Sequence, residues 1–191
     1  MARLSAKVRR EEFIRAAAKV IAEHGVGGAT TRKIAEQADA PLAALHYCFE
    51  SKEALLDSLY EEQIKVMGES TWTIEPGIGL AETAAEMIPQ LMDWYIEEPD
   101  FAQASGDLLF WSHHNDRELG QRGIAAAVDV IRDTLAKGAN KQPDRELVEP
   151  MSTLVLALSD GLLLQWLTFK DKAMLDDGVA VAVRAVKNFC R

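Results

Sequence analysis

The feature that most restricts this 191-residue chain is a pair of short helical segments separated by only a three-residue turn. The first segment starts at the threonine pair Thr30-Thr31, either of which can cap a helix. The second starts at Pro41, a residue that suits the first turn of a helix. Two short helices joined in this way are typical of a helix-turn-helix, so the stretch predicts that motif with Asp39-Ala40 in its turn.

One side of each short helix carries the residues that would hold the pair together. Ile34, Ala35 and Ala38 share a side of the first helix, where small residues allow a close crossing. Leu45 and Phe49 are four residues apart on the second helix and would complete this core.

The other side of the second helix carries mostly small residues, namely Leu42, Ala43, Ala44 and His46. Small side chains let a helix backbone enter the major groove of DNA, which is about 12 Å wide. Leucine and alanine cannot bond to base edges, but they can pack on thymine methyl groups. We therefore expect base readout to depend on thymine contacts and on His46.

Polar residues that could bind phosphates lie around this face. Thr31 would offer its hydroxyl and free backbone N–H groups at a helix N-terminus. Tyr47 and Lys52 would flank the groove-facing helix, and Arg32 or Lys33 could reach bases from the preceding one. The predicted DNA-binding residues are Thr30, Thr31, Arg32, Lys33, Pro41, Leu42, Ala43, Ala44, His46, Tyr47 and Lys52.

Charge is distributed unevenly along the chain, whose net charge is -9. Residues 1–52 hold nine basic and six acidic side chains, whereas the remainder holds 12 basic and 24 acidic ones. A basic front on an acidic body favours a polyanion-facing end, with chance variation as the alternative. Arg3, Lys7, Arg9 and Arg10 could form an arm that reaches DNA, or a solvated terminus.

Helix-forming residues dominate the chain, and no segment alternates with the two-residue period of a strand. We predict an all-α fold of about nine helices. Residues 1–51 would form a three-helix DNA-binding domain, and residues 52–191 an effector-binding and dimerisation domain. Residues 52–72 would be the connecting helix between them, and an apolar helix over residues 80–97 would be kinked at Pro89.

A pocket among packed helices is where helical bundles bind ligands, and aromatic residues would line it. Core packing is the alternative role for these side chains, and Asp160 could instead support a subunit contact. The predicted effector-binding residues are Met87, Leu91, Trp94, Tyr95, Phe110, Trp111, His114, Asp160 and Trp166.

Apolar stripes on the last two helices would suit dimerisation, since two helices from each subunit make a four-helix bundle. Packing within the monomer is the alternative. The predicted dimer residues are Leu154, Leu158, Gly161, Leu162, Gln165, Val179, Val183 and Val186.

Several other classes of protein are not supported by the sequence. His113 and His114 are adjacent, so they point about 100° apart on a helix and do not suit one metal ion. No nucleophile motif is legible, so we expect neither an enzyme nor a metal or other cofactor. The most apolar stretch, residues 153–169, is interrupted by polar residues, so we expect no membrane span. We expect a cytoplasmic, nucleoid-associated protein.

The run ATTRKIAEQADAPLAALHYCFESKEALL resembles the DNA-binding module of the tetracycline-repressor (TetR) family of bacterial regulators. The resemblance covers about residues 9–60 and implies a homodimer, a palindromic operator and a small effector. Thr31, Tyr47 and Lys52 match phosphate-binding positions of the family, and residues 41–44 match the start of its recognition helix.

The chain departs from the family pattern at Asp39, Pro41, His46 and Cys48, where glycine, serine, tyrosine and histidine are usual. The resemblance as a whole predicts a dimeric, ligand-released repressor, whereas these departures motivate a rival with weakened DNA specificity. The alternatives are an activator on the same fold, and a small-molecule-binding or scaffold protein with weakened DNA specificity.

Overall fold

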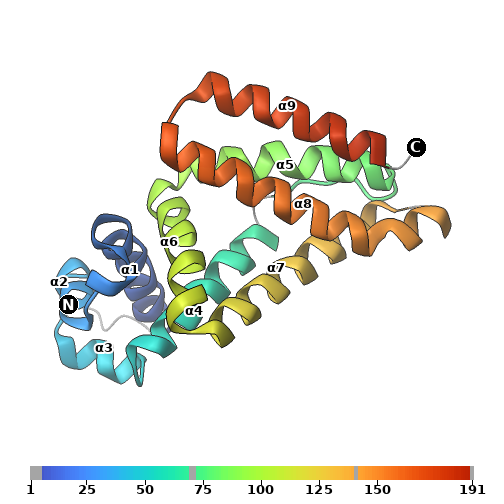
Figure 1. Ribbon diagram of the computed structural model, residues 1–191. Helices are drawn as coiled ribbons and strands as arrows, with labels where there is room; N and C mark the ends of the chain where they lie inside the picture. The colour runs from blue at the N-terminus through green and yellow to red at the C-terminus, as the bar shows by residue number, and fades with distance from the viewer. Residues whose placement is uncertain (1–5, 69–71, 140–141, 190–191) are drawn as a thin grey trace. The chain divides into compact units, whose positions relative to one another are not determined.

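The computed structural model describes residues 6–68, 72–139 and 142–189, which contain nine α-helices and no strand (Figure 1). The prediction of an all-α chain with about nine helices is confirmed. The helices are α1 (Ala6–Gly28), α2 (Thr31–Gln37), α3 (Leu42–Cys48), α4 (Lys52–Val66), α5 (Leu80–Glu97), α6 (Pro99–Asn115), α7 (Arg117–Gly138), α8 (Gln142–Phe169) and α9 (Lys172–Phe189).

Helix boundaries follow local signals. Helix α5 begins and ends where the sequence predicts, with Pro89 inside it. Helix α9 begins at Lys172, only three residues after α8 ends. The reason is local, because Lys170 adopts a left-handed φ of 51° after α8, and the Asp171 carboxylate accepts the Ala173 N–H at 2.9 Å. Both features set a new helix start directly after the old helix end.

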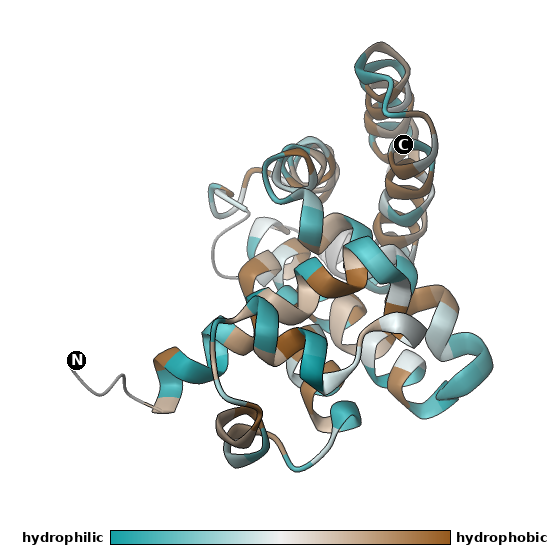
Figure 2. Ribbon diagram, turned by 90° about the vertical axis from the view of Figure 1, so that its left-hand side faces the viewer, coloured by the Kyte–Doolittle hydropathy of each residue, from teal (hydrophilic) through white to brown (hydrophobic). Residues whose placement is uncertain are grey.

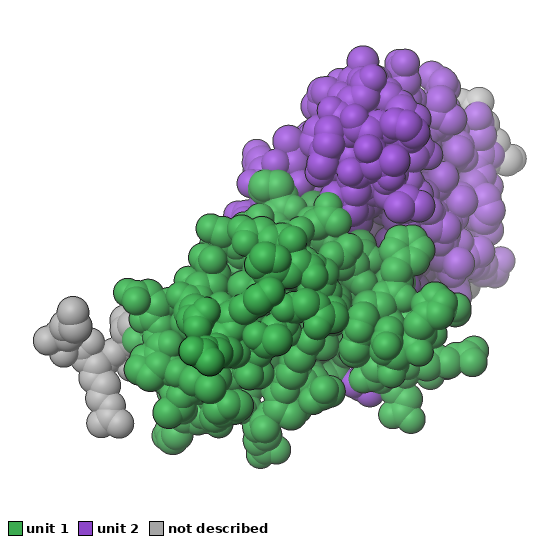
Figure 3. All heavy atoms as spheres, turned by 60° about the vertical axis from the view of Figure 1, so that its left-hand side comes forward, with its two compact units in different colours: residues 1–63, 99–121 green, residues 64–98, 122–191 purple. Residues whose placement is uncertain are grey.

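The chain divides into two compact units, coloured separately in Figure 3. The first contains residues 1–63 and 99–121. Within it α1 packs against α6, α2 and α3. Its core includes the fully buried side chains of Phe13, Ile21, Ile34 and Leu45.

The second unit contains residues 64–98 and 122–191. Helix α5 packs against both α8 and α9, and these two helices also pack on each other. The core lies between them and includes Met87, Ile88, Leu91, Met151 and Val155. Apolar and polar segments alternate along the helices in Figure 2, as expected for helices that bury one side.

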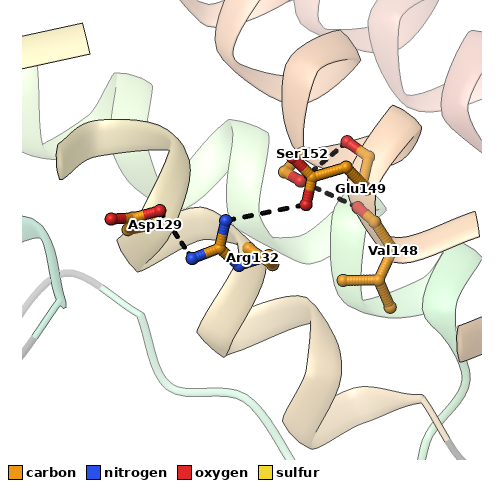
Figure 4. A network of polar contacts seen from close by, with 5 residues as sticks. All are labelled: Asp129, Arg132, Val148, Glu149 and Ser152. Carbon is orange, nitrogen blue, oxygen red and sulfur yellow. Dashed lines mark hydrogen bonds and ion pairs between the residues drawn. The ribbon is translucent and has the colours of Figure 1, made fainter. Parts of the chain in front are cut away.

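A polar network joins α7 to α8 within the second unit (Figure 4). The Arg132 guanidinium donates to Asp129 at 2.5 Å and lies 3.6 Å from the Glu149 carboxylate of α8. One turn later, the Ser152 hydroxyl donates back to the Val148 carbonyl at 2.8 Å. Because the Arg132 and Glu149 side chains are 38% and 66% exposed, this ion pair contributes little to stability.

Among the described residues, one stretch is long and apolar enough to cross a membrane by length and composition, Glu146–Phe169 in α8. In the structure this helix packs on α5 and α9, and such a helix also occurs in the core of soluble proteins. Only 39% of the apolar window is buried within the single chain. Most of this apolar window is therefore not covered within the single chain.

Candidate nucleic-acid interface

The start of α2 is built by two local features. Gly25 adopts φ 67° and ψ 166°, which breaks the helical path of α1 before residues 26–28. Thr30 then caps α2, and its hydroxyl accepts the Lys33 N–H at 3.2 Å. Thr31 follows as the first helical residue and is half-buried. The N–H groups of this first turn are thus presented at the position where a phosphate could bind.

The turn between α2 and α3 is a Schellman motif with aspartate at the left-handed position. Asp39 has φ 47°, and its N–H donates to the Glu36 carbonyl at 3.1 Å. The Ala40 N–H donates to the Ala35 carbonyl at 3.0 Å. This is the bond pattern that usually places glycine at the Asp39 position. Aspartate tolerates the left-handed region, so the turn forms without the glycine.

Helix α3 is held by one buried side. Leu45 is fully buried and Phe49 is 2% exposed. The Phe49 ring meets the Phe13 ring of α1 edge to face, with centroids 6.4 Å apart. The N–H of Phe49 also closes the end of α3 by donating to the Leu45 carbonyl at 2.8 Å. The seven-residue helix therefore depends on these tertiary contacts for its stability.

The opposite side of α3 faces solvent. Pro41, Leu42, Ala43 and His46 are exposed, and Tyr47 is 85% exposed, while Ala44 is half-buried. An exposed tyrosine and leucine beside two alanines give a narrow, largely apolar ridge with a hydroxyl and an imidazole at its edges. A ridge of this width and chemistry can enter a major groove and contact thymine methyl groups.

The basic residues near this ridge have different surroundings. Arg32 and Lys33 are exposed, and Arg32 pairs with Glu36 of the same helix at 3.1 Å. Lys52 is half-buried, and its ammonium donates to the Val26 carbonyl at 2.5 Å. Burial lowers the pKa of Lys52, and the nearby Glu53 carboxylate partly offsets this effect. The structure thus gives Lys52 a partner in α1, in addition to the phosphate contact predicted for it.

Two of the N-terminal basic residues have partners within the first unit. Arg9 pairs with Glu12 at 2.8 Å, and Arg10 is bonded inside the first unit. Lys7 is exposed, and Arg3 lies outside the described residues. The prediction of an arm is therefore wrong for Arg10, because its partners are more than 30 residues away in the sequence and gave no local signal.

The predicted effector-binding residues are distributed over both compact units. Met87 and Leu91 lie in the core of the second unit, where Trp94 and Tyr95 are half-buried with rings 5.1 Å apart. Trp166 is half-buried, with the Lys170 ammonium 5.2 Å from its ring centroid. In the first unit Phe110 and His114 are exposed and Trp111 is half-buried.

Asp160 is a half-buried carboxyl on the apolar helix α8. Burial raises the pKa of Asp160 from 3.8 to about 6. Its neighbour Ser159 is buried, and the Ser159 hydroxyl has no hydrogen-bond partner among the described residues. Two adjacent polar groups in an apolar setting are costly to the fold, which is typical of residues retained for binding.

Asp160→Asn should therefore stabilise the protein at pH 7. Below about pH 4 the carboxyl is protonated in both the folded and unfolded states, and above about pH 6 it is ionised in both. The destabilisation of the folded state by the Asp160 carboxylate thus grows as pH rises between these values. A pKa shift of this size corresponds to about 1–3 kcal/mol of stability. Urea unfolding at pH 4 and pH 7 measures it, with the exposed Asp177→Asn as control. An equal gain at both pH values would contradict the assignment.

The predicted dimer residues separate into two groups. Leu162 is 6% exposed and Val186 is fully buried, so both belong to the monomer core and not to a subunit surface, which corrects the prediction. Leu154, Leu158, Val179 and Val183 are partly buried and pack against the same core. Gln165 is exposed and Gly161 is half-buried. The spacing of the stripe is helical, but the sequence did not resolve which side of the helix faces the monomer core.

A capped helix, a tight turn and a second helix with one buried and one exposed side define a helix-turn-helix protein. The sequence model described as bacterial regulatory proteins, tetR family, matches residues 13–59, which contain this motif. The HTH-type nicotine-responsive transcriptional repressor HdnoR of Paenarthrobacter nicotinovorans is 26% identical over 172 residues, which cover 86% of each chain.

Two further likenesses concern the module and the fold. The tetracycline repressor protein class A from transposon 1721 of Escherichia coli is 43% identical over 58 residues, which are 30% of this chain and 27% of that repressor. The transcriptional regulator FadR from Bacillus subtilis, in complex with stearoyl-CoA, has a TM-score of 0.69 at 21% identity. That alignment covers 91% of this chain and 97% of FadR. Residues 13–59 are thus a DNA-binding module of the TetR family, and the chain is a helix-turn-helix transcriptional regulator of this type.

Proposed function

We propose that this chain is a homodimeric repressor that binds a palindromic operator through α3 and leaves it when a small molecule binds. Residues 1–51 would be the DNA-binding domain, and residues 52–191 the effector-binding and dimerisation domain. The observation that carries the proposal is the exposed ridge of α3, formed by Leu42, Ala43, His46 and Tyr47 over a buried Leu45. No residue of the ridge is needed for the core, so its composition is free to serve recognition.

A second copy of the chain is the proposed cover for the free side of α8 and α9. Ala157 and Leu164 are exposed at helical spacing on α8, and Val181 and Ala185 are exposed at helical spacing on α9. Leu164 is 48% exposed and Val181 is 55% exposed. Two such helices from each subunit would form a four-helix bundle. The two-fold axis would then set two recognition helices about 34–36 Å apart, which matches successive major grooves on one side of DNA.

The effector is proposed to bind among the helices of residues 52–191. One relative is a nicotine-responsive repressor, and a protein of the same fold was crystallised with stearoyl-CoA. These ligands differ widely, so they support a small-molecule effector in general and do not identify the effector of this chain. In such coupling, binding of the effector typically changes the affinity for DNA by about 5- to 150-fold.

The proposal is tested by measuring binding of the protein to the DNA upstream of its own gene at several salt concentrations. We expect specific binding whose affinity falls as salt rises, because phosphate contacts release counterions. Selection from randomised half-sites should yield thymine where Ala43 and Ala44 make contact. Absent or salt-insensitive binding would instead favour a small-molecule-binding protein without DNA specificity. Increased transcription of the regulated gene when the protein is bound would indicate an activator.

A further inference from the structure

Arg10 of α1 joins three helices of the first unit. One guanidinium nitrogen donates to the Cys48 carbonyl, at 2.5 Å, and the other donates to the Ser58 hydroxyl of α4, at 2.9 Å. The guanidinium carbon also lies 4.3 Å from the centroid of the Phe49 ring. The Arg10 side chain therefore contacts Cys48, which is the last residue of α3. It also contacts Phe49, which caps that helix, and Ser58 in the middle of α4.

The contact with Cys48 meets a specific need of α3. The last carbonyls of a helix have no intrahelical donor, and a cation near them interacts favourably with the helix dipole. Helix α3 has only seven residues, so it cannot hold its own orientation. Arg10 supplies a charged donor at the end where α3 would otherwise fray.

The contact with Ser58 ties the same end of α3 to α4. The Ser58 hydroxyl donates to the Ala54 carbonyl at 3.0 Å, which leaves its oxygen oriented to accept from Arg10. A planar guanidinium can bond to two acceptors and stack on an aromatic ring at the same time, whereas an ammonium cannot reproduce this geometry. The site is thus built for arginine.

We propose that Arg10 is a positioning residue for DNA recognition, which fixes the orientation of α3 against α1 and α4 and does not itself bind phosphate. This inference rests on the proposed use of α3 as the recognition helix. It separates Arg10 from the other basic residues of the N-terminal segment. Through Arg10, α4 is also linked to the end of the recognition helix α3.

The test compares Arg10→Met and Arg10→Lys with Arg15→Met, a matched control at an exposed position of the same helix. Operator affinity is measured by fluorescence anisotropy at several salt concentrations, well below the unfolding temperature of each variant. We expect Arg10→Met to weaken specific binding by about tenfold or more, with Arg10→Lys intermediate, because misorienting α3 loses base contacts. The slope of log affinity against log salt should stay unchanged.

The salt slope decides between positioning and direct contact. Loss of one phosphate contact lowers the slope by about 1, so a reduced slope for Arg10→Met would overturn the proposal. Unchanged affinity would also overturn it.

Amide hydrogen exchange gives an independent readout that needs no DNA. We expect faster exchange at the Phe49 N–H and along α3 in Arg10→Met, with α6 unaffected. Uniformly faster exchange in all helices would indicate a general loss of stability and would contradict positioning. If the parent protein does not bind DNA, the proposed function fails, but the exchange result still shows whether Arg10 orders α3.

Discussion

Ala43→Glu is expected to weaken operator binding strongly and to leave the fold intact. Ala43 is exposed on α3, and no core residue depends on it. In the groove the new carboxylate would meet phosphates of like charge, which costs several kcal/mol. It would also replace a methyl group that packs on thymine. We expect affinity to fall by about 100-fold or more, which corresponds to about 3 kcal/mol.

The matched control is Ala136→Glu, the same change at an exposed position of α7. Circular dichroism should give the same helix content for both variants, and the control should bind DNA nearly as the parent does. An additional charge lowers non-specific binding slightly in both. If Ala43→Glu bound the operator as tightly as the control, α3 would not be the helix that enters the groove.

Leu164→Arg is expected to separate the proposed dimer. Leu164 is 48% exposed on α8, so the change adds a charge to the proposed subunit surface without disturbing the core. A buried, unpaired charge at an interface costs several kcal/mol, so light scattering should report a monomer at micromolar concentration. Operator affinity should fall by about 100-fold or more, because the second half-site then no longer binds at high effective concentration.

Two further variants make this result specific. Val181→Arg changes the proposed partner surface on α9, where the side chain is 55% exposed, and should also give a monomer. Ile124→Arg places the same charge on α7, at a residue that is 40% exposed, and should leave the oligomeric state unchanged. A parent protein that is monomeric, or a Leu164→Arg variant that remains dimeric, would contradict the proposed interface.

The recognition module could be predicted in detail because its signals are local. The threonine cap, the left-handed Asp39 and the apolar pair Leu45 and Phe49 all act between residues within about five positions of one another. The boundaries of α5 were predicted for the same reason. Periodicity likewise indicated that α8 and α9 each have an apolar stripe.

The position of such a stripe relative to a neighbour is not a local property. Leu162 and Val186 share the period of the predicted dimer stripe, but packing against α5 places both inside the monomer. Leu164 and Val181 remain outside, although their side chains are equally apolar. The sequence contains the spacing, whereas the rotation of each helix depends on which neighbour it meets.

By itself the sequence determined the helical class, the capped and turned recognition module, and the small apolar residues that α3 would present to DNA. Only the tertiary structure decided that Arg10 closes the end of α3 and that Lys52 bonds to α1. Arg10 lies 38 residues from Cys48, and Lys52 lies 26 residues from Val26. Caps and turns are set by a few consecutive residues, but such distant pairs form only when helices pack, because burial brings together groups that the chain order keeps apart.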